Sequence, residues 1–115
     1  MRAMNWFSSD RPERRAEPRR VVNAAGVVVA SGLEVGCVIL DLSTGGMRIR
    51  LSRNLPLPEQ VVVVEIAAGL AHEARVVRRD GHEVGLKRAG QARLGGLTPA
   101  RLTAAREAWI RAGGR

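Results

Sequence analysis

Short valine-rich segments separated by turn residues run from residue 21 to residue 89. Their spacing and β-branched content predict six strands, at 21–31, 35–42, 46–51, 60–67, 71–79 and 82–89. In the third segment Met47, Ile49 and Leu51 alternate with arginines, which is typical of a strand buried on one face. Strands of this kind form a small sandwich or barrel, and a closed barrel leaves no exposed edge. The sequence therefore predicts a mainly β fold, a six-stranded antiparallel β-barrel.

The pattern changes to a helical period near the C-terminus. Leu102, Ala105 and Trp109 are spaced to line one face of a helix. Thr98 is suited to cap the start of this helix, and Gly113 is suited to end it. We expect one C-terminal α-helix over residues 98–112. Its apolar face requires cover, either from the barrel or from another chain, and the second arrangement would make a homodimer.

The first 20 residues follow neither pattern. They are rich in charge, and Pro12 and Pro18 stand too close together for a helix between them. We expect a flexible basic arm at residues 1–20, the barrel at 21–96, and the helix with a short tail at 97–115.

The chain is strongly basic, with a formal net charge of +8 and a sequence pI of about 11.6. Such an excess predicts an anionic partner, which could be a nucleic acid, a nucleotide or a membrane surface. The positive charge is concentrated in residues 1–23 and 87–115. All basic residues except Lys87 are arginines, whose planar guanidinium suits phosphates and base edges.

Several classes of function lack the residues that they need. Cys37 is the single cysteine, which indicates a reducing, cytoplasmic location, and with two histidines a metal site is not expected. The sequence has no glycine loop for a nucleotide phosphate and no nucleophile elbow around Ser43, so we expect no enzyme and no catalytic residue. No aromatic residue occurs in 21–89 to stack nucleic-acid bases. The apolar run 61–71 is too short to span a bilayer.

The candidate for chemistry is the stretch Asp41-Leu-Ser-Thr-Gly-Gly46, where one predicted strand ends and the next begins. Asp41 and Ser43 alternate with leucines, so both polar side chains should leave the strand on one face. Gly45 and Gly46 permit a positive φ or the close approach of another group to the backbone. Taken alone, the stretch is better explained as a tight hairpin between two buried strands.

A second motif, Arg15-x-x-x-Arg19, stands just before the first predicted strand. The pair of motifs, in this order and at this separation, resembles the PilZ domain family over roughly residues 11–89. Members of that family carry an RxxxR arm followed by a D/NxSxxG strand end, and they bind the bacterial second messenger cyclic di-GMP. Many members also have an aromatic residue in the closing strand, where this chain has Gly85-Leu-Lys87-Arg88, which adds positive charge near the barrel mouth.

The resemblance implies a set of ligand-binding residues: Arg14, Arg15, Arg19, Asp41, Ser43, Gly46 and Arg48. Arg15 and Arg19 would hold phosphates and the Hoogsteen edges of guanine, and Arg14 would stack over a base. Asp41 would accept hydrogen bonds from guanine N1–H and N2–H₂, and Ser43 would bind a guanine edge or a phosphate. Gly46 would let a purine ring lie against the backbone, with Arg48 as a further candidate. No cofactor is implied besides the ligand.

The leading hypothesis is a cyclic di-GMP receptor whose arm becomes ordered over the barrel mouth on binding and relays to a partner protein. One alternative is a basic module that binds nucleic acid or another anionic surface without sequence specificity. Another is a PilZ-like interaction module that self-associates through helix 98–112.

Overall fold

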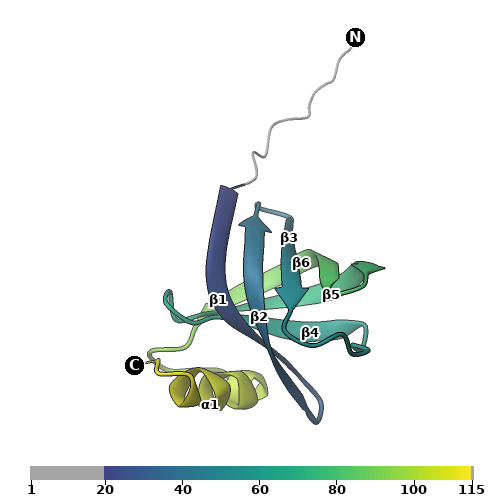
Figure 1. The fold of residues 1–115 in the computed structure, drawn as a ribbon. Helices are drawn as coiled ribbons and strands as arrows, with labels where there is room; N and C mark the ends of the chain where they lie inside the picture. Colours follow the sequence, from purple (N-terminus) through teal and green to yellow (C-terminus); the bar gives the residue numbers. More distant parts are fainter. Residues whose placement is uncertain (1–19, 115) are drawn as a thin grey trace.

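The computed structural model describes residues 20–114 and shows a closed antiparallel barrel followed by one helix (Figure 1). The strands are β1 (Arg20–Ala30), β2 (Leu33–Leu42), β3 (Gly46–Leu51), β4 (Gln60–Glu65), β5 (Leu70–Asp80) and β6 (Glu83–Arg93). They follow the order β1-β2-β3-β6-β5-β4 around the barrel, and β4 pairs back to β1. The predicted six-stranded antiparallel barrel is confirmed. The arm predicted at residues 1–20 lies outside the described residues, apart from the start of β1 at Arg20.

Two apolar clusters explain why β1 and β4 are so rich in valine. One cluster fills the barrel interior and includes Val28 and Val63, both with no exposed surface. The other lies between the outside of the barrel wall and the C-terminal helix, and it includes Val27 and Val64. Because successive side chains of a strand face opposite sides, these two strands are buried on both faces. Each fully buried valine stabilises the fold by about 1.5 kcal/mol or more.

The C-terminal helix is shorter than predicted. A 3₁₀ turn, η2 (Ala100–Leu102), precedes the α-helix α1 (Thr103–Arg111). Thr98 does not cap the helix, because its Oγ1 donates a hydrogen bond back to the Gly96 carbonyl over 3.2 Å. The predicted end is correct, since Gly113 has φ +100° and its N–H donates to the Ile110 carbonyl over 3.0 Å.

The apolar face of α1 packs on the barrel of its own chain. Leu102, Ala105 and Trp109 are 1%, 2% and 5% exposed and belong to the cluster beneath β1 and β4. Nε1 of Trp109 donates a hydrogen bond to the Ile66 carbonyl over 2.9 Å. The apolar face that would have supported a homodimer through 98–112 is thus covered by the barrel of the same chain. The homodimer stays a prediction, but this face no longer supports it. Over residues 20–114, no helix has the length and apolar content required to cross a membrane.

Candidate functional site

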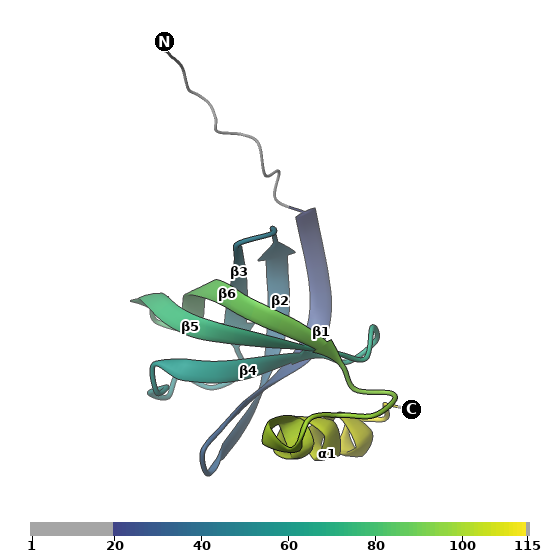
Figure 2. The ribbon, with the colours of Figure 1, turned by 180° about the vertical axis from the view of Figure 1, so that it is seen from behind.

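The turn that carries the predicted motif lies at the end of the barrel where β1 begins. Figures 1 and 2 show β2 ending and β3 starting there, at the opposite end of the barrel from α1. The ladder between the first two strands pairs Val21 with Asp41 and Arg20 with Leu42. The chain that precedes β1 therefore joins the barrel beside Asp41. The candidate residues that lie in that preceding chain, outside the described residues, are Arg14, Arg15 and Arg19.

A bulge in β2 brings Asp41 to the outer face of the barrel. The pairing of β2 with β3 changes register between Ile39 and Asp41. Ile39 and Leu42 both belong to the interior cluster, which requires one extra residue between them, Leu40. Asp41 is consequently paired with Arg48 and is only 5% exposed. Nε of Arg48 donates a hydrogen bond to Oδ2 of Asp41 over 3.0 Å, so these two candidate residues are in contact.

Ser43 and Gly46 close the turn between β2 and β3. The Ser43 N–H donates to the Gly46 carbonyl over 2.9 Å, and Ser43 Oγ donates to the same oxygen over 3.3 Å. The glycines with a positive φ in the described part of the chain are at positions 32, 69, 81 and 113. Of the two alternatives left open for Gly45 and Gly46, a positive φ is not observed, and close approach of another group to their backbone stays a prediction. The structure thus brings together all four candidate residues that it describes.

One residue at this end was underestimated from the sequence. Arg88 of β6 was expected only to add charge near the barrel mouth, but its guanidinium donates to the Ser43 carbonyl over 2.5 Å. Its position could have been inferred, because Val84 and Leu86 face the interior and Arg88 continues their alternation on β6. Its partner, the Ser43 carbonyl in the β2–β3 turn, lies 45 residues earlier in the chain and could not have been inferred in this way.

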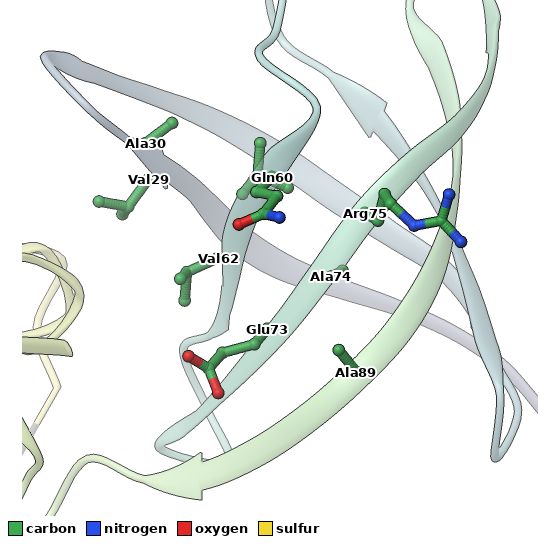
Figure 3. A pocket seen from close by; sticks show the side chains of 9 residues that line it. Val29, Ala30, Gln60, Val62, Glu73, Ala74, Arg75 and Ala89 are labelled. Carbon is green, nitrogen blue, oxygen red and sulfur yellow. The ribbon is translucent and has the colours of Figure 1, made fainter. Parts of the chain in front are cut away.

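Two of the hollows on the described surface bear on the choice of site. One, of about 500 Å³, is bordered by Asp41, Arg48, Arg78 and Gly85, so it adjoins the candidate residues. The other, of about 470 Å³, lies over β1, β4 and β5 and has mainly aliphatic walls (Figure 3). Its acidic residue, Glu73, is held by Arg101, whose Nε donates over 2.9 Å and thereby lowers the pKa of the carboxyl group. The first hollow is the one that fits the sequence prediction.

Two buried titratable groups lie inside the barrel. His72 is 1% exposed, and burial lowers its pKa below the usual 6.5, with the nearby charge of Arg88 acting in the same direction. The neutral ring donates from Nε2 to Oε1 of Glu65 over 3.0 Å, which partly opposes that shift. Burial also raises the pKa of Cys37 to about 12. Over residues 20–114 no three His, Cys, Asp or Glu side chains gather closely enough to hold a metal ion.

Comparison with known proteins agrees with this arrangement. The family model described as PilZ domain matches residues 13–95, which span the RxxxR motif, the β2–β3 turn and all six strands. Among curated proteins, none matches the chain. Because the match covers well over half of the sequence, the chain belongs to the PilZ domain family.

Proposed function

We propose that this chain is a bacterial, cytoplasmic receptor for cyclic di-GMP that transmits ligand binding to a partner protein. PilZ domains are a known family of cyclic di-GMP receptors and act as binding modules rather than enzymes. The observation that carries the proposal is the β1–β2 register, which pairs Val21 with Asp41. Arg19 is two residues before Val21 in the sequence, and two residues of chain span at most about 7 Å, so Arg19 would lie near Asp41. The RxxxR motif would therefore meet the DxSxxG motif at one end of the barrel.

The described half of the site has the chemistry that a guanine nucleotide requires. The Asp41 carboxylate is an acceptor on the outer face of the barrel, where Nε of Arg48 donates to its Oδ2. Two adjacent N–H donors of guanine match such an acceptor, whereas adenine presents a different edge. Arg48 also lies 3.6 Å from Glu83, which keeps its guanidinium beside the hollow bordered by Asp41.

The arginines of the arm supply the complementary charge. Arg15 and Arg19 would bind the phosphates and guanine O6/N7 edges through bidentate contacts, and Arg14 would stack on a base. The arm would become ordered only when the ligand fills the space between it and Asp41. Ordering a segment on binding creates a new surface, and that surface would engage the partner protein.

Calorimetric titration with cyclic di-GMP is the direct test. We expect Arg15→Ala and Arg19→Ala each to weaken binding by about 2–4 kcal/mol, because each removes one member of a charged hydrogen-bonded contact. Arg106→Ala on α1 is the matched control, since it removes the same charge at the opposite end of the barrel. Absence of heat at high micromolar ligand would refute the proposal, and unchanged affinity in both arm variants would exclude the arm from the site.

The net charge of +8 also suits a binder of nucleic acid or another anionic surface. That function predicts affinity for DNA or RNA that falls steeply with salt and does not depend on sequence. A gel-shift series over salt, with cyclic di-GMP as competitor, separates the two functions, because only a guanine-specific site is competed at low micromolar concentration.

A further inference from the structure

One residue of β6 holds three successive carbonyls of the β2–β3 turn. Nη1 of Arg88 donates to the Ser43 carbonyl over 2.5 Å and to the Thr44 carbonyl over 3.4 Å. The backbone N–H of Arg88 donates to the Gly45 carbonyl over 3.0 Å. The turn is therefore tied to β6 along its whole length, and not only through the ladder between β3 and β6.

Arg88 reaches the turn from the inside of the barrel. It follows Val84 and Leu86 on the inward face of β6, and its Nε is buried without a hydrogen-bond partner. The other terminal nitrogen of its guanidinium, Nη2, donates to Oε1 of Gln91 over 2.6 Å, which fixes the plane of the group. Arg88 pairs with Ala74 of β5, which belongs to the interior cluster. The guanidinium thus closes the core directly beneath the turn.

The turn needs such support because of its sequence. Gly45 and Gly46 have more conformational freedom than other residues, so ordering them costs more entropy. The peptides are trans, so the N–H groups of Thr44, Gly45 and Gly46 point away from the carbonyls that Arg88 holds. A displaced turn would misplace Ser43 and Gly46 relative to Asp41.

We propose that Arg88 is a positioning residue for the ligand site, which fixes the backbone of the Ser43–Gly46 turn from inside the barrel without touching the ligand. This inference rests on the proposed function for the identity of the ligand. The positioning role depends on the shape of the guanidinium and not only on its charge. One planar group holds three acceptors on two segments, the Ser43 and Thr44 carbonyls and Oε1 of Gln91. Lysine, with a compact charge on a flexible stem, does not reproduce that geometry.

The chain offers a matched control in Arg79, which holds a different loop in the same manner. Its Nη2 donates to the Leu55 carbonyl over 2.6 Å and to Oδ1 of Asn54 over 3.1 Å, and its Nε donates to the Gly81 carbonyl over 2.8 Å. Arg79→Lys therefore loses the same kind of contact as Arg88→Lys but leaves the β2–β3 turn untouched.

The first measurement is amide hydrogen exchange of the ligand-free chain. In Arg88→Lys we expect exchange at Ser43, whose N–H bonds across the turn, to accelerate about tenfold or more, the scale for loss of a charged hydrogen bond. The Leu94 amide, which bonds to the Gly69 carbonyl, should be unchanged, as should Ser43 in Arg79→Lys. A purely global loss of stability would accelerate both amides together and would overturn the proposal.

The second measurement is the affinity for cyclic di-GMP by calorimetry. Arg88→Lys should weaken binding about tenfold or more, and Arg79→Lys should stay within about twofold of the unmodified chain. Unchanged affinity in a folded Arg88→Lys protein overturns the positioning role while leaving the receptor function intact. If the unmodified chain binds no cyclic di-GMP, the proposed function fails, and the exchange at Ser43 still decides whether Arg88 fixes the turn.

Gln91→Ala covers the case in which Arg88→Lys does not fold. It removes only the partner of Nη2, so the guanidinium remains but is less fixed. We expect faster exchange at Ser43 and weaker binding, both smaller than in Arg88→Lys. Wild-type exchange and affinity in Gln91→Ala, with Arg88→Lys unfolded, would show that Arg88 stabilises the core and does not position the turn.

Discussion

Removing Trp109 tests whether α1 is anchored to its own barrel. The indole is 5% exposed and packs with the valines of β1 and β4, and its Nε1–H donates to the Ile66 carbonyl over 2.9 Å. Trp109→Ala should lower the free energy of unfolding by about 3–5 kcal/mol, the usual cost of deleting a buried aromatic side chain. Trp109→Phe keeps most of the apolar contact and loses the hydrogen bond, so it should cost about 1–2 kcal/mol.

The assay is urea unfolding followed by far-UV circular dichroism, because tryptophan fluorescence changes with the substitution itself. Ile110→Ala is the control on the same helix, since Ile110 is 51% exposed and should change stability by no more than about 0.5 kcal/mol. The unfolding midpoint should also be independent of protein concentration, because the partner of the apolar face is the same chain.

Two results would refute this reasoning. If Trp109→Ala and Ile110→Ala have equal stability, the helix does not depend on the contacts seen in the structure. If the midpoint rises with protein concentration and Trp109→Ala abolishes that dependence, the apolar face is buried between two chains, as the homodimer hypothesis requires.

Three further predictions concern buried groups of the barrel. Because the pKa of His72 is lowered in the folded state, its stabilising contribution is complete above about pH 6.5 and is lost as the pH falls toward the folded pKa, by at most about 1.4 kcal/mol per pH unit. In urea unfolding, the difference in the free energy of unfolding between pH 7.5 and pH 5.5 should therefore be smaller in His72→Gln than in the unmodified chain. An equal difference in the two proteins would contradict the assignment. Cys37, with its pKa raised to about 12, should resist iodoacetamide in the folded chain and react after unfolding, so rapid labelling of native protein by mass spectrometry would count against it. Gly26→Ala should destabilise by about 2 kcal/mol in chemical unfolding, because the new Cβ would lie 2.8 Å from the Val64 carbonyl oxygen; Gly36→Ala, whose Cβ would have only an ordinary contact at 3.5 Å, should differ from the unmodified chain by no more than about 0.5 kcal/mol.

The architecture of the barrel follows from local signals in the sequence. Valine runs marked the strands, and the turn residues between them marked the hairpins. The last four residues of β6, Gly90-Gln91-Ala92-Arg93, were missed because they include no β-branched residue, yet residues 90–92 pair with residues 71–73 of β5. The start of the helix was misjudged because Thr98 Oγ1 donates back to the Gly96 carbonyl and does not cap the first turn.

The site is less accessible to sequence reasoning because it is assembled from distant segments. The motif located Asp41, Ser43 and Gly46. The contact between Asp41 and Arg48, however, depends on a bulge at Leu40, and no residue type in this segment predicts a bulge. The support from Arg88 spans 45 residues and requires the order of strands around the barrel. Local patterns therefore identified the candidate ligand-binding residues better than the residues that support them.

The two halves of β1 have different neighbours, and this limits where a binding signal can emerge. Val27 and Val29 in the second half are covered by α1. In the first half, Val21 pairs with Asp41 and is 79% exposed. A register irregularity between Val21 and Ala24, with Asn23 at φ 49°, separates the two halves and interrupts the ladder between them. A change at the site would have to pass this irregularity and displace a fully packed interface to reach α1. A surface formed at the arm end needs neither step, so we expect the proposed partner protein to bind there, and substitutions on the exposed face of α1 should leave the proposed ligand-dependent interaction unchanged.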